Sequence, residues 1–320
     1  MKIVSCEHFF KLKYYKMKLS LRLLLLLPFI FVMVGCPSTD NGTETVVRPY
    51  AEVYNEDLIE IEDFMDSHFI TVDADYNVEF TEITTTTPGI PISSHPDLTF
   101  KTVSQGGVDH KLYFLKLREG LGNTNTDTDI SNDNPTKLDS IFSSYKGIKT
   151  DLTVFDTASN PVWFQLQDVI KGWQEIFPEF KRGNFSFNAA TGITTYSDFG
   201  AGVMFVPSGL AYFNQSAGSI GRYTPIIFSF KLKNLKFKDH DGDKLLSKYE
   251  YGGPTSGTAL DSDGDGKPDY GDFDDDNDGK YTKEEIRITP GVSGWYPFGS
   301  IPVCSPGGNG KPRHLDASCR

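Results

Sequence analysis

Two short clusters in the middle of the chain place a carboxylate or polar groups among bulky apolar side chains. The first is Val154-Phe155-Asp156, and the second is Val169-Ile170-Lys171-Gly172-Trp173. A later Gly209-Leu210-Ala211-Tyr212 and the apolar run at 226–230 complete the pattern. This stretch holds no convincing pairing of a nucleophile with a neighbouring base, so we expect no covalent catalysis there. The expected site is an aromatic pocket bordered by a carboxylate.

In order and spacing, these residues resemble an FKBP-type peptidyl-prolyl cis-trans isomerase, over roughly Gly107 to Phe237. The resemblance implies rotation of X-Pro bonds without a cofactor. Rotating a peptide bond costs about 18–20 kcal/mol because amide resonance is lost. The twisted transition state has a less polar carbonyl than the planar amide, so a pocket that removes water from the amide favours it.

The resemblance also assigns a role to each residue of the site. Trp173 would be the floor under the proline ring, Asp156 would lie beside the twisting carbonyl, and Tyr212 would donate a hydrogen bond to the substrate backbone. The expected walls are Tyr145, Phe155, Val169, Ile170, Ile220 and Phe228. Taken singly, each aromatic is better explained as a core residue and Asp156 could be a turn carboxylate; the ordered set favours the site. The sequence departs from the family at the rim, where Val162 occupies an aromatic position and Arg222 replaces a proline of the flap.

The elements that must position these residues are mostly strands. Runs at 111–117, 152–155, 202–205 and 226–232 have strand character, and a helical turn from near Gln167 would carry Val169, Ile170 and Trp173. We therefore expect an α+β fold with an antiparallel sheet around one short helix. The resemblance implies that this sheet is a half-barrel.

The N-terminal residues predict a lipoprotein signal. Lys18 and Arg22 precede an apolar run at 23–34, which is shorter than the about 20 residues of a spanning helix. The run ends at Gly35-Cys36, so we expect lipid attachment, palmitate included, at Cys36 and location in the cell envelope as a periplasmic or outer-membrane lipoprotein. An ordinary cleaved signal or an uncleaved anchor, with Cys36 incidental, is the alternative.

Composition divides the chain into six segments. They are a signal at 1–36, a polar linker at 37–49, an N-terminal helical extension at 50–100, the isomerase domain at 101–237, acidic repeats at 238–288 and a Gly/Pro-rich tail at 289–320. Apolar residues spaced along 50–69 predict an amphipathic helix. We expect it to pack on the catalytic domain, with dimerisation or client binding as the alternative.

The acidic segment carries most of the net charge of −12. Its spacing matches twelve-residue calcium loops of the EF-hand type and resembles thrombospondin type 3 repeats. The expected ligands of the third loop are Asp274, Asp276, Asp278, the carbonyl of Lys280, and Glu285. Those of the second are Asp261, Asp263, Asp265, Asp269 and Asp272. Asp239, Asp241, Asp243 and Glu250 form a weaker first loop, because Lys244 stands where glycine is expected.

Oxygen ligands at this spacing favour calcium over softer metals. We expect a structural role for it, and the alternative is a solvated acidic linker without metal. In the tail, Cys304 and Cys319 predict a disulfide in an oxidising compartment. The acidic balance argues against nucleic acid as a partner.

Together these patterns predict an envelope isomerase that assists the folding of exported, proline-containing polypeptides. One alternative is a non-catalytic chaperone or peptide-binding module with an altered groove. Another is a calcium-ordered structural protein in which the isomerase fold is only a scaffold.

Overall fold

A computed structural model describes residues 46–122, 134–252, 258–288, 293–304 and 307–319. The predicted signal, the lipid-attachment residue Cys36 and most of the predicted linker lie outside these ranges. Among the described residues, no helix has the length and apolar character needed to cross a membrane.

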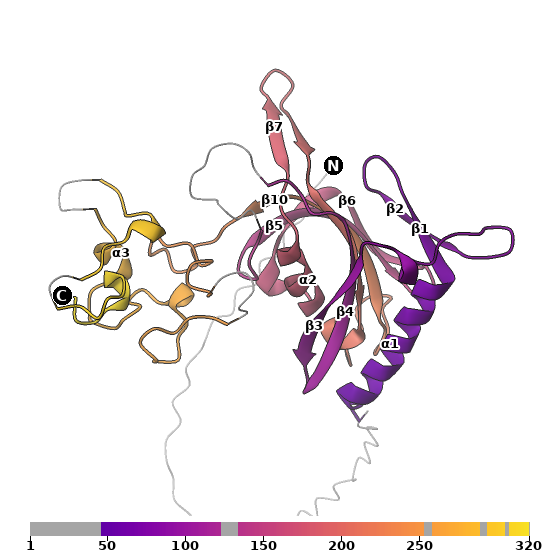
Figure 1. Cartoon of the computed structure of the whole chain (residues 1–320), viewed down its shortest axis with the longest axis horizontal. Helices are drawn as coiled ribbons and strands as arrows, with labels where there is room; N and C mark the ends of the chain where they lie inside the picture. Colours follow the sequence, from indigo (N-terminus) through magenta and orange to yellow (C-terminus); the bar gives the residue numbers. More distant parts are fainter. Residues whose placement is uncertain (1–45, 123–133, 253–257, 289–292, 305–306, 320) are drawn as a thin grey trace, which may run out of the picture. The chain divides into compact units, whose positions relative to one another are not determined.

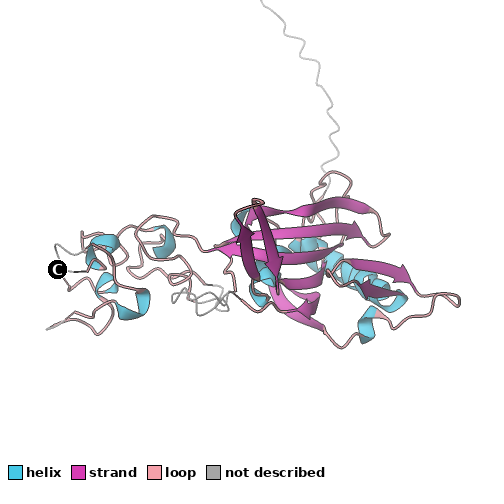
Figure 2. Ribbon diagram, turned by 90° about the horizontal axis from the view of Figure 1, so that it is seen from above, coloured by secondary structure: helices cyan, strands magenta, loops and turns pink. Residues whose placement is uncertain are grey.

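The centre of the fold is a six-stranded antiparallel sheet with the strand order β3-β4-β9-β10-β5-β6. Its strands are β3 (Leu98–Gln105), β4 (Val108–Arg118), β5 (Ser140–Lys149), β6 (Val154–Gln165), β9 (Gly200–Val206) and β10 (Ile226–Lys236). The sheet is open, with β3 and β6 as its edges, and helices lie against it (Figure 2). The predicted α+β class and antiparallel sheet are confirmed.

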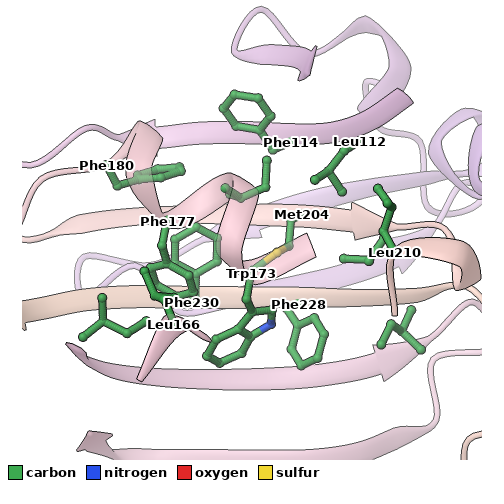
Figure 3. Close-up of a cluster of buried hydrophobic side chains, with 14 of the residues drawn as sticks. Leu112, Phe114, Leu166, Trp173, Phe177, Phe180, Met204, Leu210, Phe228 and Phe230 are labelled. Carbon is green, nitrogen blue, oxygen red and sulfur yellow. The ribbon is translucent and has the colours of Figure 1, made fainter. Parts of the chain in front are cut away.

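The short helix α2 (Lys171–Ile176) lies against one face of the sheet (Figure 1). Trp173 of this helix packs on Phe228 of the sheet, and Phe177 just after the helix packs on Phe230 (Figure 3). Ile176 belongs to the same buried cluster. The helix can approach closely because Gly172 faces β9, where a Cβ atom would lie 2.6 Å from Cγ1 of Val206. Trp173 is thereby held at a fixed depth above the sheet.

The long helix α1 (Tyr50–Ser67) packs on the opposite face. Ile61, Phe64 and Met65 form one cluster with residues of the sheet that include Phe205. Since both faces are covered, every residue of β9 is buried, which a one-sided antiparallel strand would not show. The apolar face of α1 therefore packs on the six-stranded sheet.

The region predicted as a helical extension also contains strands. After α1 come the hairpin of β1 (His68–Val72) and β2 (Val78–Glu82), the turn η1 (Ile92–Ser94), and the start of β3. The turn between β1 and β2 is closed by Asp73, whose carboxylate accepts the N–H groups of Asp75 and Asn77. This local side-chain bonding closes the turn of the hairpin, after α1 has already ended at Ser67.

A second hairpin, β7 (Asn184–Asn188) and β8 (Ile193–Ser197), projects from the sheet (Figure 1). Three short 3₁₀ turns lie between the strands of this part of the chain. They are η2 (Leu166–Asp168), η3 (Phe177–Glu179) and η4 (Ser208–Leu210). The prediction that Val169 and Ile170 lie on the helix is wrong. They follow η2 in an extended connection, and α2 begins only at Lys171.

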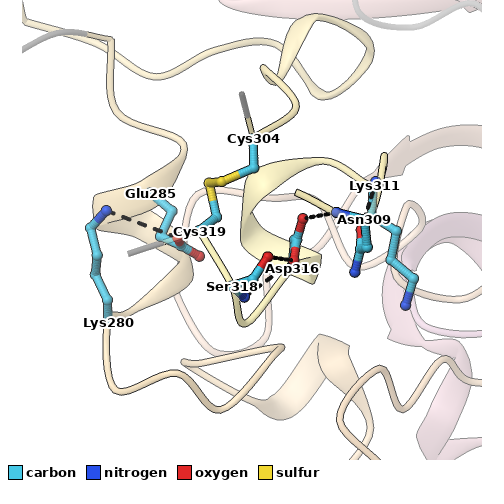
Figure 4. The surroundings of a disulfide bond; sticks show 8 residues. All are labelled: Lys280, Glu285, Cys304, Asn309, Lys311, Asp316, Ser318 and Cys319. Atoms are coloured by element: carbon cyan, nitrogen blue, oxygen red, sulfur yellow. Dashed lines mark hydrogen bonds and ion pairs between the residues drawn. A yellow bond between two sulfur atoms is a disulfide. The ribbon is translucent and has the colours of Figure 1, made fainter. Parts of the chain in front are cut away.

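The C-terminal segment consists mostly of loops with the short elements η5 (Asp269–Gly271), α3 (Thr282–Glu285), η6 (Phe298–Ser300) and η7 (Arg313–Leu315) (Figure 2). Leu245, Ile286 and Ile301 form a small apolar cluster in it. Cys304 and Cys319 are joined by a disulfide with 5.5 Å between their Cα atoms (Figure 4). With so few apolar side chains, this segment needs other sources of stability, such as the disulfide.

Candidate functional site

A pocket of about 240 Å³ opens between α2 and the end of the sheet formed by β5, β6 and β10. Its lining residues are Tyr145, Phe155, Asp156, Phe164, Asp168, Val169, Ile170, Trp173, Tyr212 and Phe228. Pockets for drug-sized ligands run to about 300–1,000 Å³. This one therefore suits a single side chain with its neighbouring backbone rather than a large cofactor.

Trp173 lies at the centre of the pocket's aromatic side chains. The ring centroids of Tyr145, Phe164 and Phe228 lie 5.1, 5.2 and 5.2 Å from it, with interplanar angles of 84°, 75° and 85°. Edge-to-face contacts of this kind hold rings in fixed orientations. The indole Nε1 is buried and has no hydrogen-bond partner among the described residues, so the floor of the pocket combines an apolar surface with one free donor.

The wall formed by Phe155 depends on a glycine. Phe155 stands edge-on to Phe228 at a centroid distance of 5.4 Å. Its ring lies over Gly147 of β5, where a Cβ atom would be 2.5 Å from Cζ of Phe155 and 2.9 Å from Cε1 of Phe228. The absence of a side chain at Gly147 leaves the space that the ring of Phe155 occupies.

Polar groups lie at the mouth of the pocket. The Tyr145 hydroxyl donates to Oδ2 of Asp156 at 2.5 Å, and Oδ1 of Asp156 accepts the N–H of Thr157. Burial and the hydrogen bond to Asp156 raise the pKa of Tyr145. Burial also raises the pKa of Tyr212, which has the Asp156 carboxylate nearby. Both phenols therefore remain protonated donors at neutral pH.

The structure brings together eight of the nine residues predicted for this site. Ile220 is the exception: it is buried in the apolar core and does not line the pocket. Two lining residues, Phe164 and Asp168, were not predicted. Phe164 provides the aromatic wall expected at Val162, whose side chain is exposed.

The burial pattern of β6 explains the missed Phe164. Along this strand the partly buried residues are Phe155, Ala158, Pro161 and Phe164, one in three rather than one in two. Two register shifts opposite β5 break the usual alternation. A search for period-two alternation could not find this face.

The three acidic loops share one backbone geometry. A carboxylate oxygen of the first residue of each loop (Asp239, Asp261 or Asp274) accepts the N–H of the sixth residue. That sixth residue has positive φ in all three: 87° at Lys244, 93° at Gly266 and 90° at Gly279. Lys244 thus adopts the conformation that glycine adopts in the other two loops.

The third loop has the donor set that calcium requires. One oxygen each of Asp274, Asp276 and Asp278 lie within 4.8 Å of one another. Both oxygens of Glu285, which is 1% exposed, lack a hydrogen-bond partner within the described residues, and its nearest cation is Nζ of Lys280 at 3.9 Å (Figure 4). Burial and repulsion from Asp276 raise the pKa of Glu285 to about 8. Orphaned buried carboxylate oxygens of this kind fit a hard cation.

The second loop fits less completely. Asp261, Asp263 and Asp265 converge, but Asp261 and Asp265 are exposed and only Asp263 is half-buried. Asp269 accepts hydrogen bonds from the N–H and the hydroxyl of Ser262 at 2.7 Å. Asp272 accepts the N–H of Asp274 and pairs with Lys267. As ligands, Asp269 and Asp272 stay predictions.

The fold and the pocket define an antiparallel-sheet protein with an aromatic, apolar peptide-sized groove. In sequence, the chain is 34% identical over 105 residues to a probable FKBP-type peptidyl-prolyl cis-trans isomerase, FkpA, of Neisseria meningitidis, covering 32% of this chain and 33% of that protein. It is 33% identical over 108 residues to the peptidyl-prolyl cis-trans isomerase Mip of Coxiella burnetii, covering 32% and 40%. The chain thus spans only a third to two-fifths of the length of these relatives.

Over about a third of its length, the chain is homologous to FKBP-type isomerases. Among solved structures, it resembles a peptidyl-prolyl cis-trans isomerase of Pseudomonas syringae pv. tomato, with a TM-score of 0.36 and 17% identity over 59% of this chain and 97% of that one. For FkpA of Escherichia coli the TM-score is 0.32, with 23% identity over 45% and 54%. Residues 236–309 match a family described as BamM C-terminal.

Proposed function

We propose that this protein is a peptidyl-prolyl cis-trans isomerase of the FKBP type that acts on exported polypeptides at the cell envelope. The observation that carries the proposal is the pocket floored by Trp173 and walled by Tyr145, Phe155 and Phe228, with Asp156 and Tyr212 at its mouth. The homology to FKBP-type isomerases supports it.

The pocket would act on the amide by excluding water. A proline ring seated on Trp173 places the preceding carbonyl among aromatic edges, where the planar, polar amide loses hydration that the twisted amide needs less. Asp156 is held in place by the Tyr145 hydroxyl, so its charge is oriented before substrate binds. Tyr212, kept protonated, donates to the substrate backbone. No bond is made or broken, and no cofactor takes part.

The test is cis-to-trans relaxation of X-Pro peptides in the presence of the full chain purified in detergent. We expect Asp156→Ala and Tyr212→Phe each to lower kcat/KM about tenfold, a loss of about 1.4 kcal/mol in transition-state stabilisation. Asp156 is exposed, so its replacement leaves the core intact. Trp163→Ala is the matched control, because Trp163 lies on β6 outside the pocket and is 50% exposed.

Absence of acceleration by the folded parent would overturn the enzyme proposal. Proline-peptide binding without turnover, lost on replacement of Trp173, would then establish the non-catalytic binding module. Equal loss of activity in Trp163→Ala and Asp156→Ala would place the chemistry elsewhere.

The proposal extends to the two ends of the chain. Cys36 carries the lipid anchor, which mass spectrometry of the mature N-terminus tests against Cys36→Ala.

The acidic segment binds calcium in a structural role, supported by the buried, unpartnered oxygens of Glu285. Asp274, Asp276, Asp278 and Glu285 would hold the ion, which would neutralise their mutual repulsion. Calcium titration by calorimetry tests this, and Glu285→Gln is expected to lose the third-loop site.

A further inference from the structure

A further group of carboxylates joins the first acidic loop to the third, which are distant in sequence. One oxygen each of Asp243, Glu250 and Asp275 lie within 4.8 Å of one another. Asp243 and Glu250 belong to the first loop, whereas Asp275 belongs to the third. Their side chains are 1%, 3% and 2% exposed, so this is the most deeply buried acidic cluster of the described residues.

These carboxylates have almost no compensation inside the protein. Neither oxygen of Glu250 and neither oxygen of Asp275 has a hydrogen-bond partner among the described residues, and the same holds for Oδ2 of Asp243. The other oxygen of Asp243 accepts the N–H of Leu245 at 2.7 Å. Burying unpaired charges side by side is strongly unfavourable unless the groups are protonated or share a cation.

The geometry suits calcium. Calcium takes six to eight oxygens at about 2.3–2.6 Å, so two of its ligands lie at most about 5 Å apart. The oxygens of this cluster meet that limit. Asp241, whose Oδ2 is also buried and unpartnered among the described residues, converges with Asp239 and Asp243 and so belongs to the first loop's own cluster.

Asp275 has no role in its own loop's ligand pattern. It lies between Asp274 and Asp276, and only these two converge with Asp278. Its N–H donates to Oγ1 of Thr282, which fixes the backbone and leaves the carboxylate directed at the first loop. A residue at the second position of a twelve-residue loop is not a ligand of that loop, which is why its spacing carried no signal.

The first loop is attached to the isomerase domain. It follows β10 directly, and the N–H of Lys238 donates to Oδ1 of Asp139 at 3.0 Å. Asp139 is fully buried and also accepts from the N–H and hydroxyl of Thr136. The carbonyl of Lys238 accepts the N–H of Ser247 within the first loop.

We propose that Asp243, Glu250 and Asp275 form a buried calcium site that ties the third acidic loop to the first, and through it to the isomerase domain. The inference rests on the proposed calcium binding of the acidic segment. It adds Asp275 as a ligand supplied from another loop, and it makes the order of the C-terminal segment depend on one shared ion.

The test compares the full chain with Asp275→Asn and with Glu284→Gln. Glu284→Gln is the control, because it also removes one negative charge, but at an exposed residue of the same segment that belongs to none of the clusters. Calcium bound per chain is measured by equilibrium dialysis, and hydrogen exchange of residues 239–250 and 274–285 is followed with calcium and with chelator. We expect Asp275→Asn to lose one calcium or to bind it at least tenfold more weakly. Exchange should then rise in both loops, while the control matches the parent.

Three results would overturn the inference, and they are distinguishable. Unchanged calcium binding by Asp275→Asn, with the parent binding calcium, would leave the other loop sites and reject this one. Faster exchange confined to residues 274–285 would make Asp275 a structural residue of its own loop. A parent chain that binds no calcium would reject both this site and the proposed calcium binding, whatever the isomerase assay shows.

Discussion

Oδ2 of Asp57, on α1, accepts hydrogen bonds of 2.7 Å from both the backbone N–H and the hydroxyl of Ser208. Ser208 begins η4, and its carbonyl accepts the N–H of Phe213 at 2.8 Å. The turn that these bonds close carries Tyr212, which lines the pocket. The N-terminal helix therefore holds one wall of the pocket from the far side of the sheet, although no motif of the sequence connects the two.

Replacing Asp57 should change how stability depends on pH. Burial raises the pKa of Asp57 to about 6 from its ordinary 3.8, so the folded state binds a proton more tightly than the unfolded state. The stability from this proton is complete below about pH 4 and is lost as pH rises to about 6, by roughly 3 kcal/mol. Asp57→Asn should remove this fall, as measured by urea unfolding at pH 4.5 and pH 7.5.

Asp66→Asn is the control for that experiment, because Asp66 is exposed on the same helix. Carboxylates elsewhere in the chain titrate equally in the parent and in both variants, so the differences isolate Asp57. An identical pH dependence in the parent and Asp57→Asn would show that Asp57 is ionised in the folded state at acidic pH.

Removing the Tyr145 hydroxyl should impair activity more than stability. Tyr145→Phe deletes the donor to Asp156 and leaves the ring contacts with Trp173 and Phe228 in place. A hydrogen bond worth about 1 kcal/mol corresponds to about a fivefold drop in kcat/KM for X-Pro isomerisation. The free energy of unfolding, measured in parallel, should fall by no more than about 1 kcal/mol. Full activity in the variant would mean that Asp156 needs no positioning.

A methyl group at Gly147 should displace the wall of the pocket. In Gly147→Ala the new Cβ would overlap the ring of Phe155, and overpacking of this kind costs about 1–3 kcal/mol. We expect lower stability and a higher KM for proline peptides. Gly299→Ala is the comparison, because a Cβ there meets no atom within 4 Å. Equal behaviour of the two variants would show that Phe155 can move without consequence.

Replacing the strained Lys244 of the first loop by glycine should stabilise the protein. At φ 87°, Lys244 is in a region that costs a residue with a side chain roughly 1–2 kcal/mol. Lys244→Gly relieves this and loses a cation–π contact with Trp295 worth about 0.5 kcal/mol. Thermal unfolding of the calcium-free chain should show net stabilisation. Gly266→Lys, the reverse change at the equivalent position, should destabilise; a loss in both variants would show that Lys244 is not strained.

Much of the site was predictable because its signals are local. The spacing of Phe155, Asp156 and Trp173 identified the groove, and the alternating aspartates after β10 identified the acidic loops. Helix boundaries were less predictable. Val169 and Ile170 match a helical period with Trp173, but they lie in an extended connection that directs both toward the pocket.

By itself, the sequence determined the α+β class, the aromatic residues of the pocket other than Phe164, and the three acidic loops, because each depends on residue types at short, regular spacing. Only the tertiary structure decided that Phe164 forms the wall, that Asp57 holds the turn before Tyr212, and that Asp275 meets Asp243 and Glu250. The first depends on register shifts in an edge strand. The Asp57–Ser208 contact joins residues 151 positions apart, and Asp275 lies at least 25 positions from Asp243 and Glu250. At such separations the packing of different elements determines the contact, and no local periodicity of the sequence indicates it.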